Sequence, residues 1–240
     1  ARWGLGVTWV DASDLASVEK AVSPATKAIF VETPSNPLLR VCDLRGIAVI
    51  AHKHGVLAII DNTFQTPLLQ RPLDLGFHIS IHSATKFLGG HSDVVAGLVA
   101  VSDAAIGKRL YAIQNGFGAI LGPDDSWMVL RGIRTLAVRL EAQQRSAIRL
   151  ADWLAARQEV TAVHYPGLKS HPGHDLHASQ TTGPGAVMSF DLGTESAALA
   201  FLQAVKIPLT AVSLGGIETI LSWPCRMSHA SMPREERQKR

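Results

Sequence analysis

The sequence predicts an α/β protein in which a large domain, built on a mostly parallel sheet, is followed by a smaller α+β domain. Short apolar runs recur through the first hundred residues, and several end in a polar cluster, as expected of buried parallel strands. A helical pattern separates the first two runs and completes a βαβ unit. Beyond residue 160, short strands alternate with one helix, which indicates the second domain.

Four segments of the large domain have the length and composition of strands: 28–32, 56–61, 79–82 and 94–101. Polar clusters directly follow the first three, at 33–37, 62–63 and 83–86. Open α/β sheets bind ligands just outside the carboxyl ends of their strands. We therefore expect these three clusters to form one site.

The helix between the first two strands is marked at both ends. Residues 44–54 have a helical pattern, Asp43 is the candidate N-cap and Gly55 the candidate stop. A helix in this place is what a right-handed connection between two parallel strands requires. The segment therefore supports the parallel sheet.

The helical pattern returns after the fourth strand. Residues 104–115 are predicted to form a helix, and a glycine-rich break follows at 116–123. The next stretch, 124–157, is again helical in pattern, with an interruption at Gly132. We expect this long stretch to connect the two domains.

The small domain is predicted from three strand segments and one helix. The strands are 160–164, 186–192 and 209–213, and the helix is 195–205. The chain is accordingly divided into a large domain at 1–125, a linking helical region at 126–158 and a small domain at 159–240.

Composition excludes several classes of protein. With 47% hydrophobic and 18% charged residues the chain is an ordinary globular one. The net charge is +3, of which residues 234–240 supply +2 through four Lys and Arg against two Glu, so no basic stripe for nucleic acid is expected. No apolar run approaches the roughly 20 residues of a membrane span. The two cysteines, far apart in sequence, suggest the reducing cytoplasm.

Lys86 is a candidate catalytic residue because it follows an apolar strand and precedes Gly89-Gly90, so that its amine projects into a tight space. On its own, such a lysine is more often a solvated surface charge. Ser83 and Thr85 are two residues apart and face the same side of an extended chain. Two hydroxyls beside a lysine form a credible phosphate site, although a simple strand-to-turn transition would have the same sequence.

Asp61 ends the apolar run 56–60 and is predicted to be a buried carboxylate. A buried carboxylate requires a cationic partner or several hydrogen bonds. A pyridinium N–H would be such a partner. The alternative is a helix N-cap or turn aspartate.

Three other patterns suggest sites but have simpler explanations. His171, His174 and His177 are spaced like metal ligands, but Pro172-Gly173 breaks a helix there and no fourth ligand follows, so a polar loop and no metal are expected. Gly89-Gly90 lacks the pattern of a nucleotide-binding loop. Arg131 and Arg134, on one helix face, are expected to be structural.

Three motifs together resemble the cystathionine synthase and lyase family of Cys/Met metabolism enzymes. They are Val31-Glu32-Thr33-Pro34-Ser35-Asn36-Pro37, Asp61-Asn62-Thr63-Phe64 and the stretch 82–94 around Ser83-Ala84-Thr85-Lys86. Further matching motifs are 130–136, 213–216 and 227–233, so the resemblance extends along essentially the whole chain in order.

The resemblance implies an aspartate-aminotransferase-like fold, the fold type I of pyridoxal 5'-phosphate (PLP) enzymes. It implies Lys86 as the Schiff-base lysine and general base, and Asp61 as the partner of the pyridine nitrogen. Ser83 and Thr85 would bind the phosphate. PLP is therefore the expected cofactor.

Two further residues are assigned by the same resemblance. Asn36 would face the cofactor's phenolic oxygen and the substrate carboxylate. Ser213 would lie beside the substrate carboxylate and the lysine amine, although a serine in a glycine-rich turn has a simpler explanation.

The family includes enzymes of β-elimination, γ-elimination and γ-replacement. Members acting at the γ-carbon typically have glutamate before the Ser-Leu-Gly-Gly motif, where this chain has Val212. The segments 114–122 and 209–232 are also most similar to bacterial β-lyases of methionine biosynthesis. We therefore expect β-elimination of cystathionine to homocysteine, pyruvate and ammonia, with γ-synthase or γ-lyase activity as the alternative.

The resemblance also bears on assembly and on completeness. A homodimer or homotetramer is expected, because family members complete each site with residues of a neighbouring subunit. The family's ring-stacking tyrosine and its substrate-binding arginine have no counterparts between Ala1 and Arg240, so we expect this chain to be a fragment. A truncated or non-catalytic fragment unable to hold PLP is therefore a second alternative.

Overall fold

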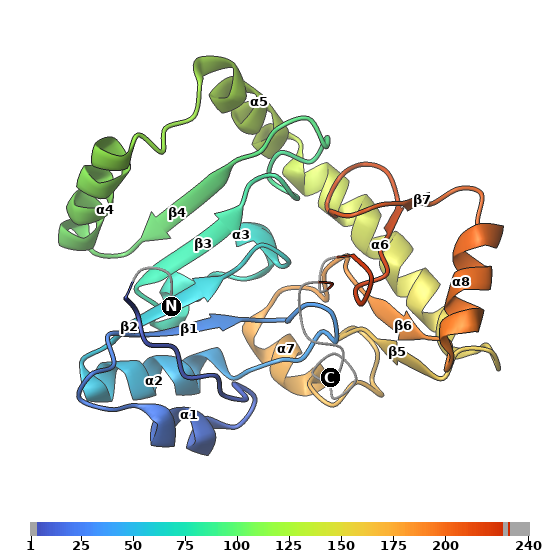
Figure 1. The fold of residues 1–240 in the computed structure, drawn as a ribbon, viewed down its shortest axis with the longest axis horizontal. Helices are drawn as coiled ribbons and strands as arrows, with labels where there is room; N and C mark the ends of the chain where they lie inside the picture. The colour runs from blue at the N-terminus through green and yellow to red at the C-terminus, as the bar shows by residue number, and fades with distance from the viewer. Residues whose placement is uncertain (1–3, 228–229, 231–240) are drawn as a thin grey trace.

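The computed structural model describes residues 4–227 and 230 of the 240-residue chain (Figure 1). Most of the motif at 227–233 lies outside the described residues. In the described part, no helix has both the length and the apolar composition needed to cross a membrane.

A four-stranded sheet forms the centre of the first half of the chain, with strand order β1-β2-β3-β4. The strands are β1 (Ala28–Glu32), β2 (Leu57–Asp61), β3 (Ile79–Ser83) and β4 (Gly97–Val101). The first three are parallel and β4 runs antiparallel to β3, which confirms the mostly parallel sheet. The prediction for the fourth strand began three residues too early.

The carboxyl ends of the parallel strands lie at one edge of the sheet. In Figure 1 the arrowheads of β1, β2 and β3 point toward the C-terminal part of the chain. Glu32 pairs with Asp61 and Asp61 with Ile81, while Ser83 is paired with Gly97 of β4. Residues paired in this way point to the same side of a sheet, so one face gathers the polar strand ends.

Helix α2 (Leu44–His54) covers the opposite face, and α1 (Leu15–Ala21) packs beside it. Asp43 caps α2 by accepting a 3.0 Å hydrogen bond from the Gly46 N–H, and Gly55 ends it with a φ of 64°. Both ends were predicted. The core between helix and sheet is fully apolar: Ile29, Val31, Leu44, Ile47, Ala48, Ala51, Ala58 and Ile60 are among its buried members.

In the first hundred residues, three short elements were not predicted. They are α1, α3 (Thr66–Leu69) and the 3-10 helix η1 (Pro72–Leu75), the last two lying between β2 and β3. Each spans two turns or less, which is too short for a hydrophobic period to show in the sequence.

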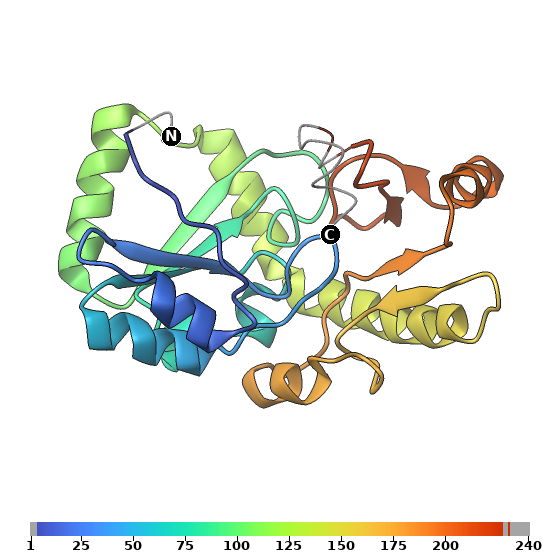
Figure 2. The ribbon, with the colours of Figure 1, turned by 60° about the horizontal axis from the view of Figure 1, so that its bottom comes forward.

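Three helices follow the sheet: α4 (Ala104–Phe117), α5 (Pro123–Arg134) and α6 (Leu136–Ala155). Figure 2 shows α4 and α5 behind the sheet and α6 running from there into the C-terminal part of the chain. The predicted interruption at Gly132 is wrong, because Gly132 is buried inside α5 and the break falls at Thr135. A Cβ on Gly132 would lie 2.2 Å from the Gly89 carbonyl oxygen. This glycine therefore allows α5 to approach the turn after β3.

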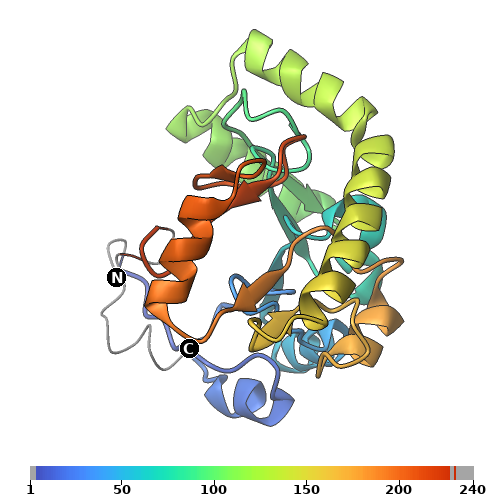
Figure 3. The same ribbon diagram turned by 90° about the vertical axis from the view of Figure 1, so that its right-hand side faces the viewer.

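The C-terminal part, after α6, forms two small sheets and two helices in its described residues (Figure 3). β5 (Ala162–His164) pairs antiparallel with β6 (Ser189–Asp191), and β7 (Leu209–Thr210) pairs parallel with β8 (Ile220–Leu221). The helices are α7 (His174–Gln180) and α8 (Glu195–Ala204). The predicted strands were too long here, β8 was missed, and the three-part domain division stays a prediction.

Helix α6 contributes to two apolar clusters. Leu136 and Leu140 pack with Phe87 and Leu88 beside the turn that follows β3. Further along the helix, side chains of α6 pack around the buried Tyr165, whose hydroxyl donates a 2.8 Å hydrogen bond to the Gly185 carbonyl. The same helix therefore joins the core near the sheet edge to the core of the C-terminal part.

The polar loop predicted around His171 is wrong in its second half, because α7 begins at His174. Gly173 precedes the helix rather than breaking it. Each of the three histidines has a backbone contact of its own: His171 with the Gly173 N–H, His174 with the Pro166 carbonyl and His177 with the Gly183 carbonyl. Among the described residues, no group of three or more His, Cys, Asp or Glu side chains could hold a metal ion.

Replacing Gly132 by alanine is expected to destabilise the protein by about 1–3 kcal/mol, because the new methyl group would overlap the backbone of the Lys86 turn. Gly107 of α4 is the matched control, since its nearest neighbour to an added Cβ is 3.4 Å away. Gly107→Ala should instead stabilise by about 0.5–1 kcal/mol. Urea unfolding of both variants checks the opposite signs, and equal effects would contradict the role given to Gly132.

Candidate active site

Lys86 lies in the turn that follows β3, and its Nζ donates a 2.8 Å hydrogen bond to Ser213 Oγ. The two residues are 127 positions apart in sequence, so the fold itself brings them together. Partial burial lowers the pKa of Lys86 below its ordinary value of 10.5. No carboxylate forms an ion pair with it in the described part of the chain. The amine is thus a nucleophile that loses its proton more readily than a surface lysine.

The Ser-Leu-Gly-Gly loop packs directly on the backbone of this turn. A Cβ on Gly215 would lie 2.6 Å from the Phe87 nitrogen and 2.8 Å from the Lys86 carbonyl carbon. The φ of Gly215 is 84°, which also favours glycine. The glycine therefore makes room for Ser213 to reach the lysine amine. Ser213 itself lies in a loop, beyond the end of β7 and not in the strand predicted for it.

Asp61, at the carboxyl end of β2, is held by the residue two positions later. Its Oδ1 accepts hydrogen bonds from the Thr63 N–H at 3.0 Å and from the Thr63 hydroxyl at 2.5 Å. The turn-aspartate interpretation is therefore also true of this residue. No Lys, Arg or His forms an ion pair with it among the described residues. The carboxylate is oriented but has no cationic partner.

Thr63 connects Asp61 to the end of β3, a role that sequence reasoning missed. Its hydroxyl oxygen accepts a 2.8 Å hydrogen bond from the Ser83 N–H while donating to Asp61. Thr63 is part of the motif at 61–64, but nothing in the sequence pattern alone shows that its hydroxyl bridges two strands.

Ser83 and Thr85 are half-buried, whereas His82 and Ala84 are buried. This alternation agrees with the prediction that the two hydroxyls face one side. The Thr85 hydroxyl accepts from the Ala96 N–H at 3.0 Å and lies 3.3 Å from the Ala96 carbonyl oxygen. To donate to a phosphate it would exchange the longer of these two contacts.

Glu32 is a second residue that sequence reasoning missed. It ends β1 directly opposite Asp61. By surface area the residue is exposed, on the face of the sheet that α2 leaves open, although neighbouring protein atoms partly bury the carboxyl group itself. This burial, together with the nearby Asp61 carboxylate, raises the pKa of Glu32 to about 7. The sheet edge therefore holds two neighbouring carboxyl groups, of which Glu32 binds a proton more readily than an ordinary glutamate does.

Asn36 is exposed in the segment after β1. Its backbone N–H donates to the Glu32 carboxylate. No hydrogen bond joins its side chain to Lys86, Asp61 or Ser213 in the described part. Its role toward cofactor and substrate stays a prediction.

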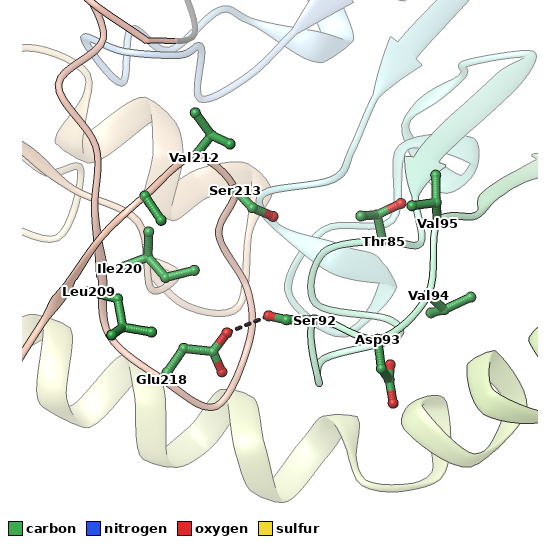
Figure 4. Close-up of a pocket in the computed structure, with 11 residues that line it drawn as sticks. Thr85, Ser92, Asp93, Val94, Val95, Leu209, Val212, Ser213, Glu218 and Ile220 are labelled. Atoms are coloured by element: carbon green, nitrogen blue, oxygen red, sulfur yellow. Dashed lines mark hydrogen bonds between the residues drawn. The ribbon is translucent and has the colours of Figure 1, made fainter.

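A cleft of about 480 Å³ opens beside Ser213, between the loop after Lys86 and the loop that joins β7 to β8 (Figure 4). Apolar side chains supply most of its lining, together with a few hydroxyl and carboxylate groups. The lining residues include Thr85, Ser92, Val95, Val212, Ser213 and Glu218. The cleft has the size of a small-ligand site.

These residues fit PLP on three structural grounds. Lys86 offers an amine with a lowered pKa and no carboxylate partner. Asp61 offers an oriented carboxylate without a cation, as a protonated ring nitrogen requires. Ser83 and Thr85 offer hydroxyls on one side of the same strand end. Arg131 and Arg134, by contrast, are exposed, and Arg131 stacks on Trp127 with its guanidinium carbon 5.4 Å from the ring centre.

The fold and this site define the class of the protein: it has the architecture of fold type I PLP enzymes. Cystathionine gamma-lyase from Lactobacillus plantarum, solved with L-serine, superimposes with a TM-score of 0.94 and 42% identity over 97% of this chain. Cystathionine gamma synthase from Xanthomonas oryzae pv. oryzae, solved with cystathionine, gives 0.93 and 43% over 95%.

The whole chain, residues 1–240, belongs to the Cys/Met metabolism PLP-dependent enzyme family. The predicted family, fold class and cofactor are thereby confirmed. Among curated relatives, the chain is 52% identical to cystathionine beta-lyase MetC of Bacillus subtilis (strain 168) over 100% of its length. It is 50% identical to cystathionine gamma-lyase of the same strain over 98%. Relatives of both specificities are therefore about equally similar.

The chain spans about three-fifths of the length of these relatives, covering 61% of the beta-lyase and 62% of the gamma-lyase. It covers 61% of the L. plantarum structure and 59% of the X. oryzae structure.

Thr63→Val is expected to destabilise the protein by about 1–3 kcal/mol, because the Ser83 N–H loses its acceptor and Asp61 loses its hydroxyl donor. Thr63→Ser keeps the hydroxyl and should stay within about 1 kcal/mol of the original protein. Urea unfolding measures both variants. Equal losses in both would show that the threonine acts through its methyl group.

The raised pKa of Glu32 predicts a pH effect with a definite sign. Because the folded-state pKa of about 7 lies above the ordinary 4.5, the folded protein binds this proton more tightly than the unfolded chain. The resulting contribution to stability is complete below pH 4.5 and is lost as the pH rises through about 7.

Glu32→Gln should remove this contribution. Between about pH 5 and 8, the original protein is then expected to lose stability relative to the variant. Urea unfolding across that range checks the difference, with Glu141→Gln on the exposed side of α6 as the control. A constant difference between the original protein and Glu32→Gln would contradict the assignment.

Proposed function

We propose that the protein is a PLP-dependent carbon-sulfur lyase that cleaves cystathionine by β-elimination, giving homocysteine, pyruvate and ammonia with one water consumed. The observation that carries the proposal is the Lys86 amine, partly buried and 2.8 Å from Ser213 Oγ, at the same sheet edge as Asp61. The 52% identity to cystathionine beta-lyase MetC supports the specificity.

PLP, when bound, supplies an aldehyde for amines and a ring that accepts electrons from the substrate α-carbon. Lys86 has the right properties to bind that aldehyde, because burial favours its neutral amine. With the cofactor bound, the neutral Lys86 Nζ would be the base that takes the α-proton of the substrate. Ser213, whose oxygen accepts from that Nζ, keeps the amine oriented within the site.

Asp61 would accept a hydrogen bond from the ring nitrogen and favour its protonated form. The Thr63 hydroxyl and N–H fix the position of the carboxylate for this contact. Ser83 and Thr85 would donate to the phosphate, and Asn36 would contact the cofactor and the substrate carboxylate. At the sheet edge, Lys86 would thus carry out the proton transfer, and Asp61 would stabilise the positive charge of the ring nitrogen.

Val212 supports β-chemistry over γ-chemistry. It lines the cleft next to Ser213 and is 61% exposed, so it meets whatever occupies the cleft. A valine there supplies no acid or base for a second proton transfer, which γ-elimination requires. The alternative, a γ-lyase or γ-synthase, is supported by the 50% identity to cystathionine gamma-lyase.

A homodimer or homotetramer in the cytoplasm belongs to the same proposal. Several large apolar side chains are exposed over β4, α4 and α5, including Val99, Tyr111, Phe117, Trp127 and Leu130. Such surfaces favour association. Cys42 is buried and forms no disulfide, which is consistent with a reducing compartment.

Borohydride reduction of protein mixed with PLP is expected to fix the cofactor on Lys86, as peptide mass spectrometry would show. Lys86→Arg keeps the charge but should abolish attachment and lower the elimination rate by at least about a thousandfold. Lys108, on the exposed helix α4, provides the control variant Lys108→Arg. Equal labelling of the Lys86→Arg protein would overturn the proposal, and absence of labelling in the original chain would support the non-catalytic alternative.

The keto acid released from cystathionine identifies the specificity. Pyruvate is expected, since β-elimination leaves three carbons, whereas γ-elimination would give 2-oxobutyrate. Val212→Glu should raise the share of 2-oxobutyrate by placing a carboxylate in the cleft beside Ser213. Release of 2-oxobutyrate as the main product of the original protein would establish the γ-alternative.

A further inference from the structure

Two hydrogen bonds join the same two loops. One is made by Lys86 itself, and the other lies further along both loops. Lys86 Nζ donates to Ser213 Oγ at 2.8 Å. Ser92 Oγ donates to Glu218 Oε1, the dashed contact in Figure 4. Ser92 follows Lys86 in the first loop, and Glu218 follows Ser213 in the second. The second bond is therefore in a position to hold the first.

The loop from Ser213 to Glu218 has few other attachments. The Gly216 carbonyl accepts a 2.6 Å hydrogen bond from Gln143 Nε2 of α6, and Gly215 contacts the backbone of Lys86. The Glu218 carboxylate lies over Gly216, because a Cβ on Gly216 would be 2.6 Å from Glu218 Oε1. Glu218 adds a side-chain attachment at the far end of the loop, beyond the backbone contacts of Gly215 and Gly216.

Backbone conformation shows that both loops need external support. Ser92 has a φ of 56° and Ser213 a φ of 93°, values that residues other than glycine seldom adopt. Such conformations persist where surrounding contacts fix them. Each of these serines takes part in one of the two inter-loop hydrogen bonds.

Charge also favours a specific contact. Glu218 is half-buried, and its pKa is lowered first by the Ser92 hydroxyl and to a lesser degree by the charge of His91. An ionised acceptor makes a stronger hydrogen bond than a neutral one. The carboxylate is thus suited to hold the serine.

We infer that Glu218 is a positioning residue, whose hydrogen bond with Ser92 holds the 213–218 loop against the 86–92 loop and keeps the Ser213 hydroxyl on the Lys86 amine. The inference deepens the proposed function, since it concerns the lysine on which that function rests. The contact itself exists without cofactor, so it can be tested on the protein alone.

Competitive acetylation with acetic anhydride, followed by mass spectrometry of the Lys86 peptide across pH, reports the state of the amine without PLP. Glu218→Ala is expected to loosen the loop, expose Lys86 and move the midpoint of its labelling profile upward, since burial is what lowers its pKa. Glu218→Gln retains an acceptor oxygen but not the charge, and should therefore shift the profile less than Glu218→Ala does. Ser92→Ala removes the same bond from the other side and should reproduce the Glu218→Ala profile.

A double-mutant cycle with Ser213→Ala separates positioning from a merely structural role. If Glu218 acts through Ser213, the effect of Ser213→Ala on the labelling profile should fall to less than about half in the Glu218→Ala background. Glu141→Ala, which removes an exposed carboxylate of α6, is the control and should leave the profile unchanged. Additive effects, or original profiles in both Glu218→Ala and Ser92→Ala, would overturn the inference.

The outcome is distinguishable from failure of the proposed function. Coupling between Glu218 and Ser213 in a protein that PLP does not label would support the positioning role and count against the enzyme. Labelling by PLP without coupling would support the enzyme and overturn the positioning role.

Discussion

The turn that carries Lys86 is held in place by two close contacts, in each of which the backbone of a glycine packs directly on the backbone of the turn. On one side the α-carbon of Gly215 faces the Lys86 and Phe87 peptide, and on the other Gly132 of α5 faces the carbonyls of Leu88 and Gly89. Protein interiors are close-packed and have low compressibility, so a displacement on one side of such a contact is passed to the other side. Three separate parts of the chain, namely the Lys86 turn, α5 and the loop that contains Gly215, therefore set the distance from the sheet edge to that loop. The same three parts set the position of the Lys86 amine.

The electrostatic character of the site follows from this confinement. Among the residues that the structure describes, Lys86 is partly desolvated without a carboxylate ion pair, and Asp61 is oriented by Thr63 without a cationic ion pair. Without a bound ligand, each of these two groups lacks a counter-ion. Such an arrangement is common at functional sites and rare in structural ion-pair networks. Glu32, opposite Asp61, adds a carboxyl whose charge is suppressed near neutral pH.

The sequence allowed prediction of those parts of the fold that depend on local interactions. The α2 boundaries at Asp43 and Gly55 follow from capping chemistry, and the strands β1, β2 and β3 from apolar runs. Lys86 and Asp61 were assigned because their motifs resemble a known family. Two of the errors have a common cause, since Gly132 inside α5 lies against the Gly89 carbonyl and Gly173 before α7 lies against Val41, contacts between residues far apart in sequence.

The roles of Thr63 and Glu218 were not predictable for the same reason. Thr63 bridges to Ser83 across 20 positions, and Glu218 meets Ser92 across 126. Hydroxyl and carboxylate side chains are common in turns, so only the folded arrangement shows what they contact. The family resemblance identified the reactive side chains, and the folded structure shows which residues hold them in position.

Helix α6 has a consequence for how the molecule unfolds. Its first turns contribute Leu136 and Leu140 to the core around the Lys86 turn, and its later turns contribute Ala147 and Ala151 to the core around Tyr165. A rigid element shared by two cores makes the loss of either one costly to the other. We therefore expect the turn that carries Lys86 and the β5–β6 sheet to unfold as one cooperative unit. A change that disturbs the geometry of the site should then also lower the global stability.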